Sequence, residues 1–260
     1  MDNVSTLIGQ LETATTSHEV WQHFLDFIAD RGFKCATYGY SYAPINTPVE
    51  EENGKDTHVR VSLAGRTWIT SMPKEGVEEY QSRHYEKVDP MIHQIEKRSM
   101  QPLYMARELL DPNDPNFKGF DFILQRAEHY GIFSAVGFPL RHAFGRGHGE
   151  VTLHAAHRID KLKEIMKMHG DEVHLASIYM HTFYQPLERK ERAARLGIKG
   201  RPHEVLQQLN AGLTNGQIAL RLGVSAPTVS FHIKELKEAL AVTSTREILP
   251  SAMRLGILDD

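Results

Sequence analysis

The segment 214–240 constrains the fold of this chain more than any other, because it carries the start and stop signals of two helices. Thr214 and Gln217 form a capping box, in which the hydroxyl and the amide satisfy each other's backbone N–H groups at a helix start. Gly223 stands where a helix ends in the left-handed conformation that glycine adopts without strain. Ser225 suits the cap of a second helix that we expect to begin at about Ala226. The segment therefore predicts two helices joined by one tight turn.

The second of these helices has two chemically different sides. Aliphatic residues recur at helical spacing and predict a buried stripe of Val229, Ile233, Leu236 and Leu240. The recognition helix of a helix-turn-helix fits the major groove of DNA with its N-terminal side chains at the base edges. The candidate DNA contacts are therefore the outward residues of this helix and the polar residues at both helix starts, namely Thr214, Asn215, Ser225, Thr228, Ser230, Phe231, Lys234 and Lys237. A solvated helix face is the alternative interpretation.

A series of short residue groups in the same region follows a fixed order: Glu204-Val205-Leu206, Gly212-Leu213-Thr214-Asn215, Ile218-Ala219, Leu222-Gly223-Val224-Ser225, Thr228-Val229 and Phe231-His232. With these groups the segment 198–258 resembles the four-helix DNA-binding domain of LuxR-type regulators. Ser244 and Glu247 supply a capping box for the fourth helix. Two positions depart from the family: Pro202 stands where a Glu is usual, and Ser230 where a Lys or Arg is usual. Losing a basic residue at the groove should weaken phosphate or guanine contact.

Length and composition predict two domains and no membrane segment. The chain has 260 residues, of which 41% are hydrophobic and 24% charged, as is ordinary for a globular protein. We assign residues 1–187 to a first domain, 188–198 to a linker and 199–260 to the helix-turn-helix domain. No stretch is apolar enough for a membrane span, and the N-terminus lacks the pattern of a signal peptide. The single cysteine, Cys35, permits no internal disulfide. We therefore expect a cytoplasmic protein.

The net charge of -3 is unevenly distributed along the chain. Residues 188–260 carry 11 Lys and Arg against 8 Asp and Glu, a net +3, which leaves 19 against 25, a net -6, for residues 1–187. A mildly basic unit binds phosphates weakly as a monomer, so two copies on one duplex are needed for useful affinity. The charge pattern therefore favours a homodimer on an inverted repeat of double-stranded DNA.

The first domain alternates strands and helices. Strands are predicted at 34–43, 59–63, 67–72, 133–141 and 150–156, and helices at 20–29, 74–83, 90–98, 117–130 and 160–187. The acidic segment 44–58 is predicted to be a loop, and the charged run 188–195 to end a long helix. The fold class is therefore α+β: an N-terminal α/β/α sandwich with an antiparallel sheet, followed by a four-helix domain.

The spacing of Tyr80 and Asp89-Pro90, with the later Gly131-Ile132 and Phe138-Pro139-Leu140, resembles the autoinducer-binding domain of LuxR-type quorum-sensing receptors. In that family the Asp accepts a hydrogen bond from the amide of an acyl-homoserine lactone and the Tyr faces the same amide. The resemblance gives these roles to Asp89 and Tyr80. From the residues alone, a buried carboxylate needs hydrogen-bond donors, which a ligand amide supplies. The alternative is that Asp89 caps a helix begun by Pro90.

Other pocket positions depart from this family. Gly76 stands where the family has a Trp that donates to the lactone carbonyl, Tyr104 replaces a second Trp, and Ala135 replaces a Gly. Strand alternation places Trp68 and Met72 on one face, so both are candidate ligand contacts together with Tyr80, Asp89, Tyr104 and Ala135. Ordinary core packing is the alternative for Trp68. Without the Trp donor, the cavity binds a lactone more weakly, a different apolar molecule, or nothing.

Catalysis and metal binding find no support in the sequence. The histidines at 142, 148, 154 and 157 match no usual zinc spacing, and the glycines at 145–149 join two strands as a hairpin turn. We therefore expect no catalytic residue, no metal and no cofactor, apart from a small-molecule effector such as an acyl-homoserine lactone.

The sequence as a whole predicts a homodimeric DNA-binding regulator that senses an apolar small molecule. Two alternatives remain open: a ligand-independent regulator whose cavity is filled by Trp68 and Tyr104, and an antagonist that dimerises with a related receptor and binds DNA poorly, for which Pro202 and Ser230 are the motivating residues.

Overall fold

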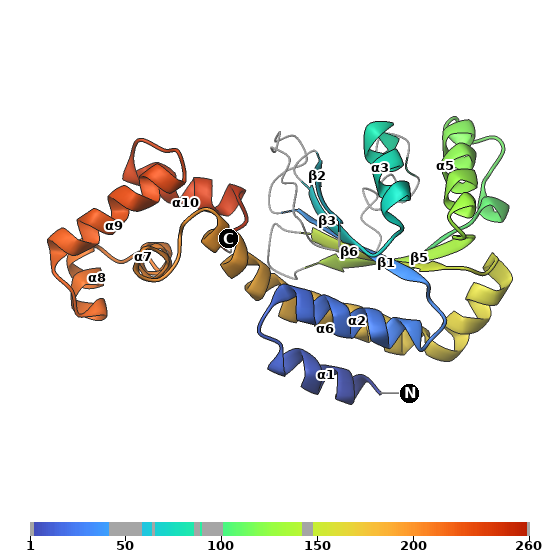
Figure 1. Ribbon diagram of the computed structural model, residues 1–260, viewed down its shortest axis with the longest axis horizontal. Helices are drawn as coiled ribbons and strands as arrows, with labels where there is room; N and C mark the ends of the chain where they lie inside the picture. Colours follow the sequence, from blue (N-terminus) through green and yellow to red (C-terminus); the bar gives the residue numbers. More distant parts are fainter. Residues whose placement is uncertain are drawn as a thin grey trace. The chain divides into compact units, whose positions relative to one another are not determined.

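The computed structural model describes residues 3–41, 59–63, 66–85, 89, 101–141 and 148–258 of the chain (Figure 1). Two compact units result: residues 1–14 with 18–183, and residues 15–17 with 184–260. The predicted loop at 44–58 and the predicted helix at 90–98 lie outside the described residues. Each unit is built on its own core.

The first unit contains one antiparallel sheet with strand order β2-β3-β1-β6-β5-β4. Its strands are β1 (Cys35–Ser41), β2 (Val59–Leu63), β3 (Arg66–Thr70), β4 (Leu103–Met105), β5 (Ser134–Arg141) and β6 (His148–Ala155). In the central register, Gly39 of β1 pairs with Trp68 of β3 on one side and with Glu150 of β6 on the other. The predicted antiparallel sheet is confirmed, and the short strand β4 is an addition to it.

Helices cover both faces of this sheet (Figure 1). One face carries α2 (Ser17–Ala29) and the first part of α6 (Ile159–Arg195), with α1 (Val4–Thr13) beside them. The other face carries α3 (Lys74–Ser82) and α5 (Phe117–His129), with the short 3-10 helix η2 (Arg107–Leu109). This is the α/β/α sandwich that the sequence predicts.

The two sheet faces differ in chemistry because successive strand residues point to opposite sides. The face toward α2 and α6 is apolar and fully packed: the Tyr38 ring lies 6.5 Å from that of Trp21, and the Phe138 ring stacks on His174 at 4.8 Å. The face toward α3 and α5 carries mainly small and polar residues, namely Thr37, Thr70, Ala135, Glu150, Thr152 and His154. The second face is therefore available for a cavity.

The helix α6 continues beyond the predicted span 160–187 into the charged run, which was predicted to end a long helix. It runs to Arg195 with Pro186 inside it. An interior proline removes a backbone hydrogen bond, so this turn needs other support. Burial of Tyr184, Gln185 and Glu188 on one side of this turn stabilises its continuation. The helix ends within the charged run, as expected.

The second unit is helical: α7 (Arg201–Asn210), α8 (Asn215–Leu222), α9 (Ala226–Ala239) and α10 (Thr245–Arg254). Its core includes Val205, Ile218, Val229, Leu236 and Ile248, all completely buried. Both predicted capping boxes form, at Thr214 with Gln217 and at Ser244 with Glu247. The four-helix domain is therefore confirmed.

Candidate DNA-binding face and ligand cavity

The turn between α8 and α9 is held by local hydrogen bonds. Gly223 ends α8 in the left-handed conformation, with φ at 65°. Ser225 then caps α9, because its side chain accepts the Thr228 N–H at 3.2 Å. At the start of α8, the Thr214 N–H donates to Gln217 Oε1 at 2.9 Å. These caps fix the start of both helices and leave their first turns open to solvent.

The outward side of α9 is solvent-accessible in its own unit. Phe231 is 58% exposed, although it is a large apolar side chain, and the Lys234 side chain is 72% exposed. Lys234 Nζ lies 3.7 Å from Glu238 Oε1, a weak surface pair that leaves the amine available. Ser230 is exposed, whereas Thr228 and Lys237 are half-buried. An exposed ring and amine on the helix that follows the turn are suited to a nucleic-acid groove.

Two features of this surface escaped the sequence analysis. Leu220, on α8, is a large apolar side chain that is nevertheless 86% exposed. His232 Nδ1 lies 2.7 Å from Glu235 Oε2 and joins adjacent turns of α9. The three-residue spacing of this pair is a signal that helix periodicity could have found.

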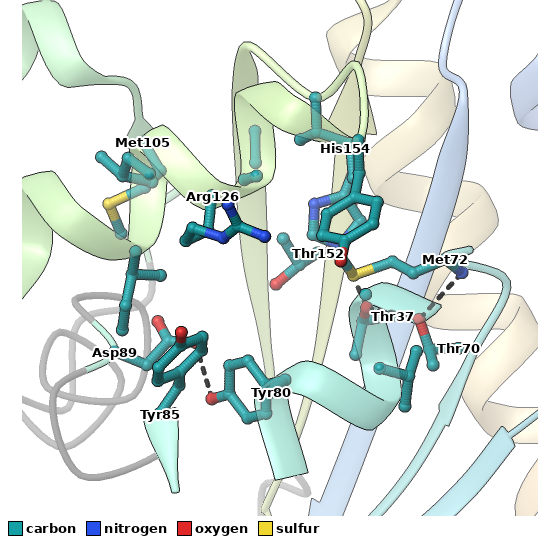
Figure 2. A pocket seen from close by; sticks show the side chains of 18 of the residues that line it. Thr37, Thr70, Met72, Tyr80, Tyr85, Asp89, Met105, Arg126, Thr152 and His154 are labelled. Carbon is teal, nitrogen blue, oxygen red and sulfur yellow. Dashed lines mark hydrogen bonds between the residues drawn. The ribbon is translucent and has the colours of Figure 1, made fainter. Parts of the chain in front are cut away.

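A cavity of about 170 Å³ lies between the polar face of the sheet and the helices α3 and α5 (Figure 2). Of the six predicted ligand contacts, five line it: Trp68, Met72, Tyr80, Asp89 and Ala135. Tyr104 does not line this cavity among the described residues. In β4 the neighbouring Met105 faces the cavity, so strand alternation turns Tyr104 to the other side, where it is 37% exposed.

One side of the cavity is formed by a carboxylate and a phenol. The Tyr80 hydroxyl, on α3, donates to Asp89 Oδ2 at 2.8 Å. Both side chains are half-buried. The proposed helix cap by Asp89 involves residues from 90 onward, which lie outside the described residues. The carboxyl group that accepts this hydrogen bond is an acceptor group at the cavity wall.

A second carboxylate, Glu79, organises the wall between α3 and α5. Arg126 donates to both of its oxygens, at 2.8 and 2.7 Å. The hydroxyls of Tyr130 and Tyr85 also donate to Glu79, at 2.8 and 2.9 Å. The Arg126 hydrogen bonds, followed by those from the two phenols, lower the pKa of Glu79 to about 2. We call Glu79, Tyr85, Arg126 and Tyr130 the Glu79 cluster.

The space beside Gly76 is already occupied by this cluster. A Cβ added at Gly76 would lie 3.2 Å from Tyr130 Cδ2, so the tyrosine ring packs directly over the glycine. The position where the resembled family places a Trp therefore has a neighbour that excludes a large side chain. In this chain, Gly76 and the Tyr130 ring form the part of the cavity wall that a Trp forms in the resembled family.

The sheet floor of the cavity is polar. The Thr37 hydroxyl lies 2.9 Å from the Thr70 hydroxyl and 3.0 Å from His154 Nε2. Burial lowers the pKa of His154 to about 4, so its imidazole is neutral at neutral pH. The sequence analysis missed this floor, although polar residues alternate along β6 at Glu150, Thr152 and His154 and could have indicated it.

Trp68 bounds the cavity at the edge of the sheet. It is 8% exposed and lies over Gly39, where an added Cβ would overlap the indole ring. Trp68 therefore packs in the core and also contacts the cavity. Its ring occupies part of the space above the floor without filling the cavity.

Other kinds of site receive no support from the described residues. They contain no group of three His, Cys, Asp or Glu side chains placed to hold a metal ion. Cys35 is buried, and burial raises the pKa of its thiol to about 12, so it is a poor nucleophile. In the same part of the chain, every helix is too short or too polar to cross a bilayer.

Two family models match the chain. The family described as "Autoinducer binding domain" matches residues 16–184, and the family described as "Bacterial regulatory proteins, luxR family" matches residues 200–252. The first match alone covers more than half of the chain.

Curated relatives match over most of their length. The transcriptional activator protein ExpR of Dickeya dadantii is 28% identical over 199 residues, which cover 73% of this chain and 76% of that protein. The quorum sensing-dependent transcriptional regulator RpaR of Rhodopseudomonas palustris is 23% identical over 193 residues, covering 74% and 75%.

Solved structures share the fold. The N-acylhomoserine lactone dependent factor CepR2 of Burkholderia cenocepacia has a TM-score of 0.53 at 16% identity and covers 71% of this chain and 94% of its own. SdiA in complex with octanoyl-rac-glycerol has a TM-score of 0.52 at 17% identity and covers 97% and 93%. At these identities the likeness concerns the architecture.

Proposed function

The chain belongs to the LuxR family of bacterial regulatory proteins and joins an autoinducer-binding domain to a LuxR-type helix-turn-helix; from this premise we propose that it is a homodimeric, cytoplasmic receptor for an acyl-homoserine lactone or a related apolar molecule. As a member of this family it is a DNA-binding transcriptional regulator. The identity of the effector, the dimer, the inverted-repeat operator and the absence of catalysis belong to the proposal.

The observation that carries the proposal is the pair formed by Tyr80 and Asp89 at the wall of a cavity. A carboxylate held by a phenol at 2.8 Å offers an acceptor to a ligand N–H. The cavity is otherwise lined largely by apolar side chains such as Val77, Met105 and Ile123. An amide next to a short acyl chain fits an acceptor at the wall with apolar side chains beside it.

The neighbouring structures support this choice of ligand class. CepR2 is described as dependent on N-acylhomoserine lactone, and SdiA was solved with octanoyl-rac-glycerol. Both molecules combine a polar head group with an acyl chain. For the present chain we propose only that the effector is an amphiphilic molecule of this kind.

The dimer is supported by an exposed apolar stripe on α6. Met168, Leu175 and Ile178 are 63%, 42% and 43% exposed and lie on one side of the helix. Large apolar side chains grouped in this way mark an interaction surface. A second copy of the chain, related by two-fold symmetry, would present two recognition helices to half-sites about 10 to 10.5 base pairs apart.

The mechanism that we propose is linkage between effector binding and the population of the DNA-competent state. An effector that binds this state more tightly raises its population, and DNA affinity rises in proportion. Electrostatic contact with phosphate supplies much of the affinity, so two copies bind far better than one.

The decisive experiment is purification of the full chain without effector, followed by selection of bound DNA from a library of inverted repeats. Selection is repeated with N-octanoyl-homoserine lactone and with 1-octanoyl-rac-glycerol. We expect enrichment of one inverted repeat that depends on an added effector. Enrichment without any effector would overturn the receptor function in favour of a ligand-independent regulator, and no enrichment at all would favour an antagonist.

The dimer surface has its own test. Leu175→Asp combined with Ile178→Asp places two charges on the stripe and should shift the protein to a monomer in sedimentation velocity. Lys118→Asp reverses the charge at an exposed position on α5 and serves as the control. A double variant that remains dimeric would contradict this surface.

A further inference from the structure

The hydroxyls on the cavity floor form a chain of hydrogen bonds that ends at a histidine. Thr70 accepts the Met72 N–H at 3.2 Å and donates to the Ala36 carbonyl oxygen at 3.2 Å. The Thr70 and Thr37 hydroxyl oxygens are 2.9 Å apart. Thr37 in turn lies 3.0 Å from His154 Nε2. All of these groups come from the central strands or from the residues that follow them (Figure 2).

Only one arrangement of protons makes all of these bonds at once. A hydroxyl has a single proton to donate. Since Thr70 donates its proton to the Ala36 carbonyl, the bond between the hydroxyls must use the proton of Thr37. Thr37 then has no proton left and can only accept from His154. The proton of the neutral imidazole is therefore on Nε2, and Nδ1 carries a lone pair.

The reverse order loses a bond. If Thr70 donated to Thr37, and Thr37 to His154, the Thr70 bond to the Ala36 carbonyl would be lost. Buried polar groups in proteins adopt the arrangement with the most hydrogen bonds. The burial that holds the pKa of His154 at about 4 also excludes an imidazolium at neutral pH.

The ring that carries the other nitrogen, Nδ1, lines the cavity. His154 lines the cavity and retains partial exposure, which distinguishes it from the fully buried Leu153 and Ala155 beside it in β6. In the described part of the chain, His154 hydrogen-bonds to Thr37 through Nε2, and no residue there hydrogen-bonds to its Nδ1. The cavity floor therefore presents a neutral acceptor whose proton state is set by Thr37.

From this geometry we propose that the effector carries a hydrogen-bond donor, a hydroxyl or an N–H, that binds His154 Nδ1 at the floor of the cavity. This donor is separate from the one received by Asp89, and the inference rests on the proposed function because it specifies the ligand of the same cavity. A methylene at this place leaves the nitrogen unpaired, and a carbonyl oxygen brings two lone pairs together. Either substitution should weaken binding by about tenfold.

The first test reads the proton position directly. In the full chain labelled with ¹⁵N-histidine, long-range ¹H–¹⁵N correlations distinguish protonated from unprotonated ring nitrogens, and the His154→Leu variant assigns the signals. We expect protonated Nε2 and unprotonated Nδ1 at neutral pH. Thr37→Val should shift the tautomer balance, whereas Thr152→Val, which removes a hydroxyl on the same face without a bond to the ring, should not. Protonated Nδ1 or an imidazolium in the unmodified chain would overturn the proposal.

The second test uses fragments that need no lactone site. Octan-1-ol offers a donor, and octan-2-one of the same length offers only an acceptor. We expect octan-1-ol to shift the His154 Nδ1 resonance at concentrations about tenfold below those needed for octan-2-one. Equal effects, a stronger effect of the ketone, or no effect of the alcohol would each contradict the proposed donor.

The third test compares complete effectors. Decanoyl-homoserine lactones that carry a hydroxyl at successive carbons are measured against the unsubstituted compound and the matching ketones by calorimetry. At least one hydroxylated isomer should bind about tenfold more tightly than its analogues, and His154→Leu should abolish this preference. If lactones bind without such a preference, the proposed donor to His154 is contradicted and the lactone effector is not. If no lactone binds but the effect of the alcohol is retained, the lactone effector is contradicted and the proposed donor is not.

Discussion

The Tyr80 hydroxyl donates a hydrogen bond of 2.8 Å to Asp89 Oδ2 and so fixes the carboxylate at the wall of the cavity. Nine positions separate the two residues in sequence, and α3 carries only the first of them. The phenol contributes to the orientation of this carboxylate, and Asp89 itself lies outside the helices and strands of the described chain. Loss of the phenol therefore affects the ligand through the carboxylate.

Tyr80→Phe should raise the effector concentration needed for half-maximal DNA binding by about tenfold, the effect of one lost hydrogen bond to a charged group. The maximal DNA binding at saturating effector should be unchanged. Tyr104→Phe removes a phenol that does not line the cavity and is the control. An unchanged effector response in the Tyr80 variant would contradict the role of this pair.

Lys234→Ala should weaken operator binding and reduce the slope of log affinity against log salt by about 0.9, the amount expected for one phosphate contact. Lys74→Ala is a matched control: Lys74 also forms an exposed pair with a glutamate four residues on, at 3.5 Å, but it lies on α3. Fluorescence anisotropy at several salt concentrations measures both slopes. The same slope in both variants would remove Lys234 from the DNA-binding face.

Glu79→Gln should destabilise the first unit by about 1 to 2 kcal/mol at neutral pH, since three partners lose a charged acceptor. The pKa of Glu79 is about 2 in the folded chain and near 4.5 in an unfolded one. Its stabilisation is therefore complete above about pH 4.5 and is lost as the pH falls toward 2. Urea unfolding across this range should show the two proteins converging at low pH. Glu78→Gln, an exposed neighbour, should show little difference at any pH.

Gly76→Trp should not restore the lactone donor of the resembled family. The new side chain would collide with the Tyr130 ring, which already lies 3.2 Å from an ideal Cβ at this position. We expect a loss of stability of about 1 to 3 kcal/mol from overpacking, measured by thermal unfolding. The double variant Gly76→Trp, Tyr130→Ala relieves the collision and should recover part of the loss. A stable single variant with tighter lactone binding would contradict this account.

The second unit could be predicted almost element by element. Thr214, Gly223 and Ser225 act through hydrogen bonds and backbone angles that span a few residues, so the sequence contains the information locally. The buried stripe of α9 also follows from helical spacing alone. Local signals of this kind do not depend on the rest of the fold.

The cavity was predictable only in part. Strand alternation correctly grouped Trp68 with Met72, and the resemblance placed Tyr80 near Asp89. The Glu79 cluster joins residues 47 positions apart, a pairing that no local pattern contains. Tyr104 was placed at the cavity by position within the family, but β4 turns its side chain to the opposite face. The role of His154 Nδ1 as an acceptor was not predictable, because it depends on hydrogen bonds between residues of β1, β3 and β6.

Among the described residues, the hydrophobic core of the second unit is built from residues between 193 and 258, and α9 is packed against this core. Substitutions that line the cavity of the first unit therefore leave the residues packed beneath Phe231 and Lys234 unchanged. Under the proposed function, evolution can change which effector the protein binds while the same promoters are kept, and it can change the promoters while the same effector is kept. Diversification of input and output can proceed independently in such an architecture.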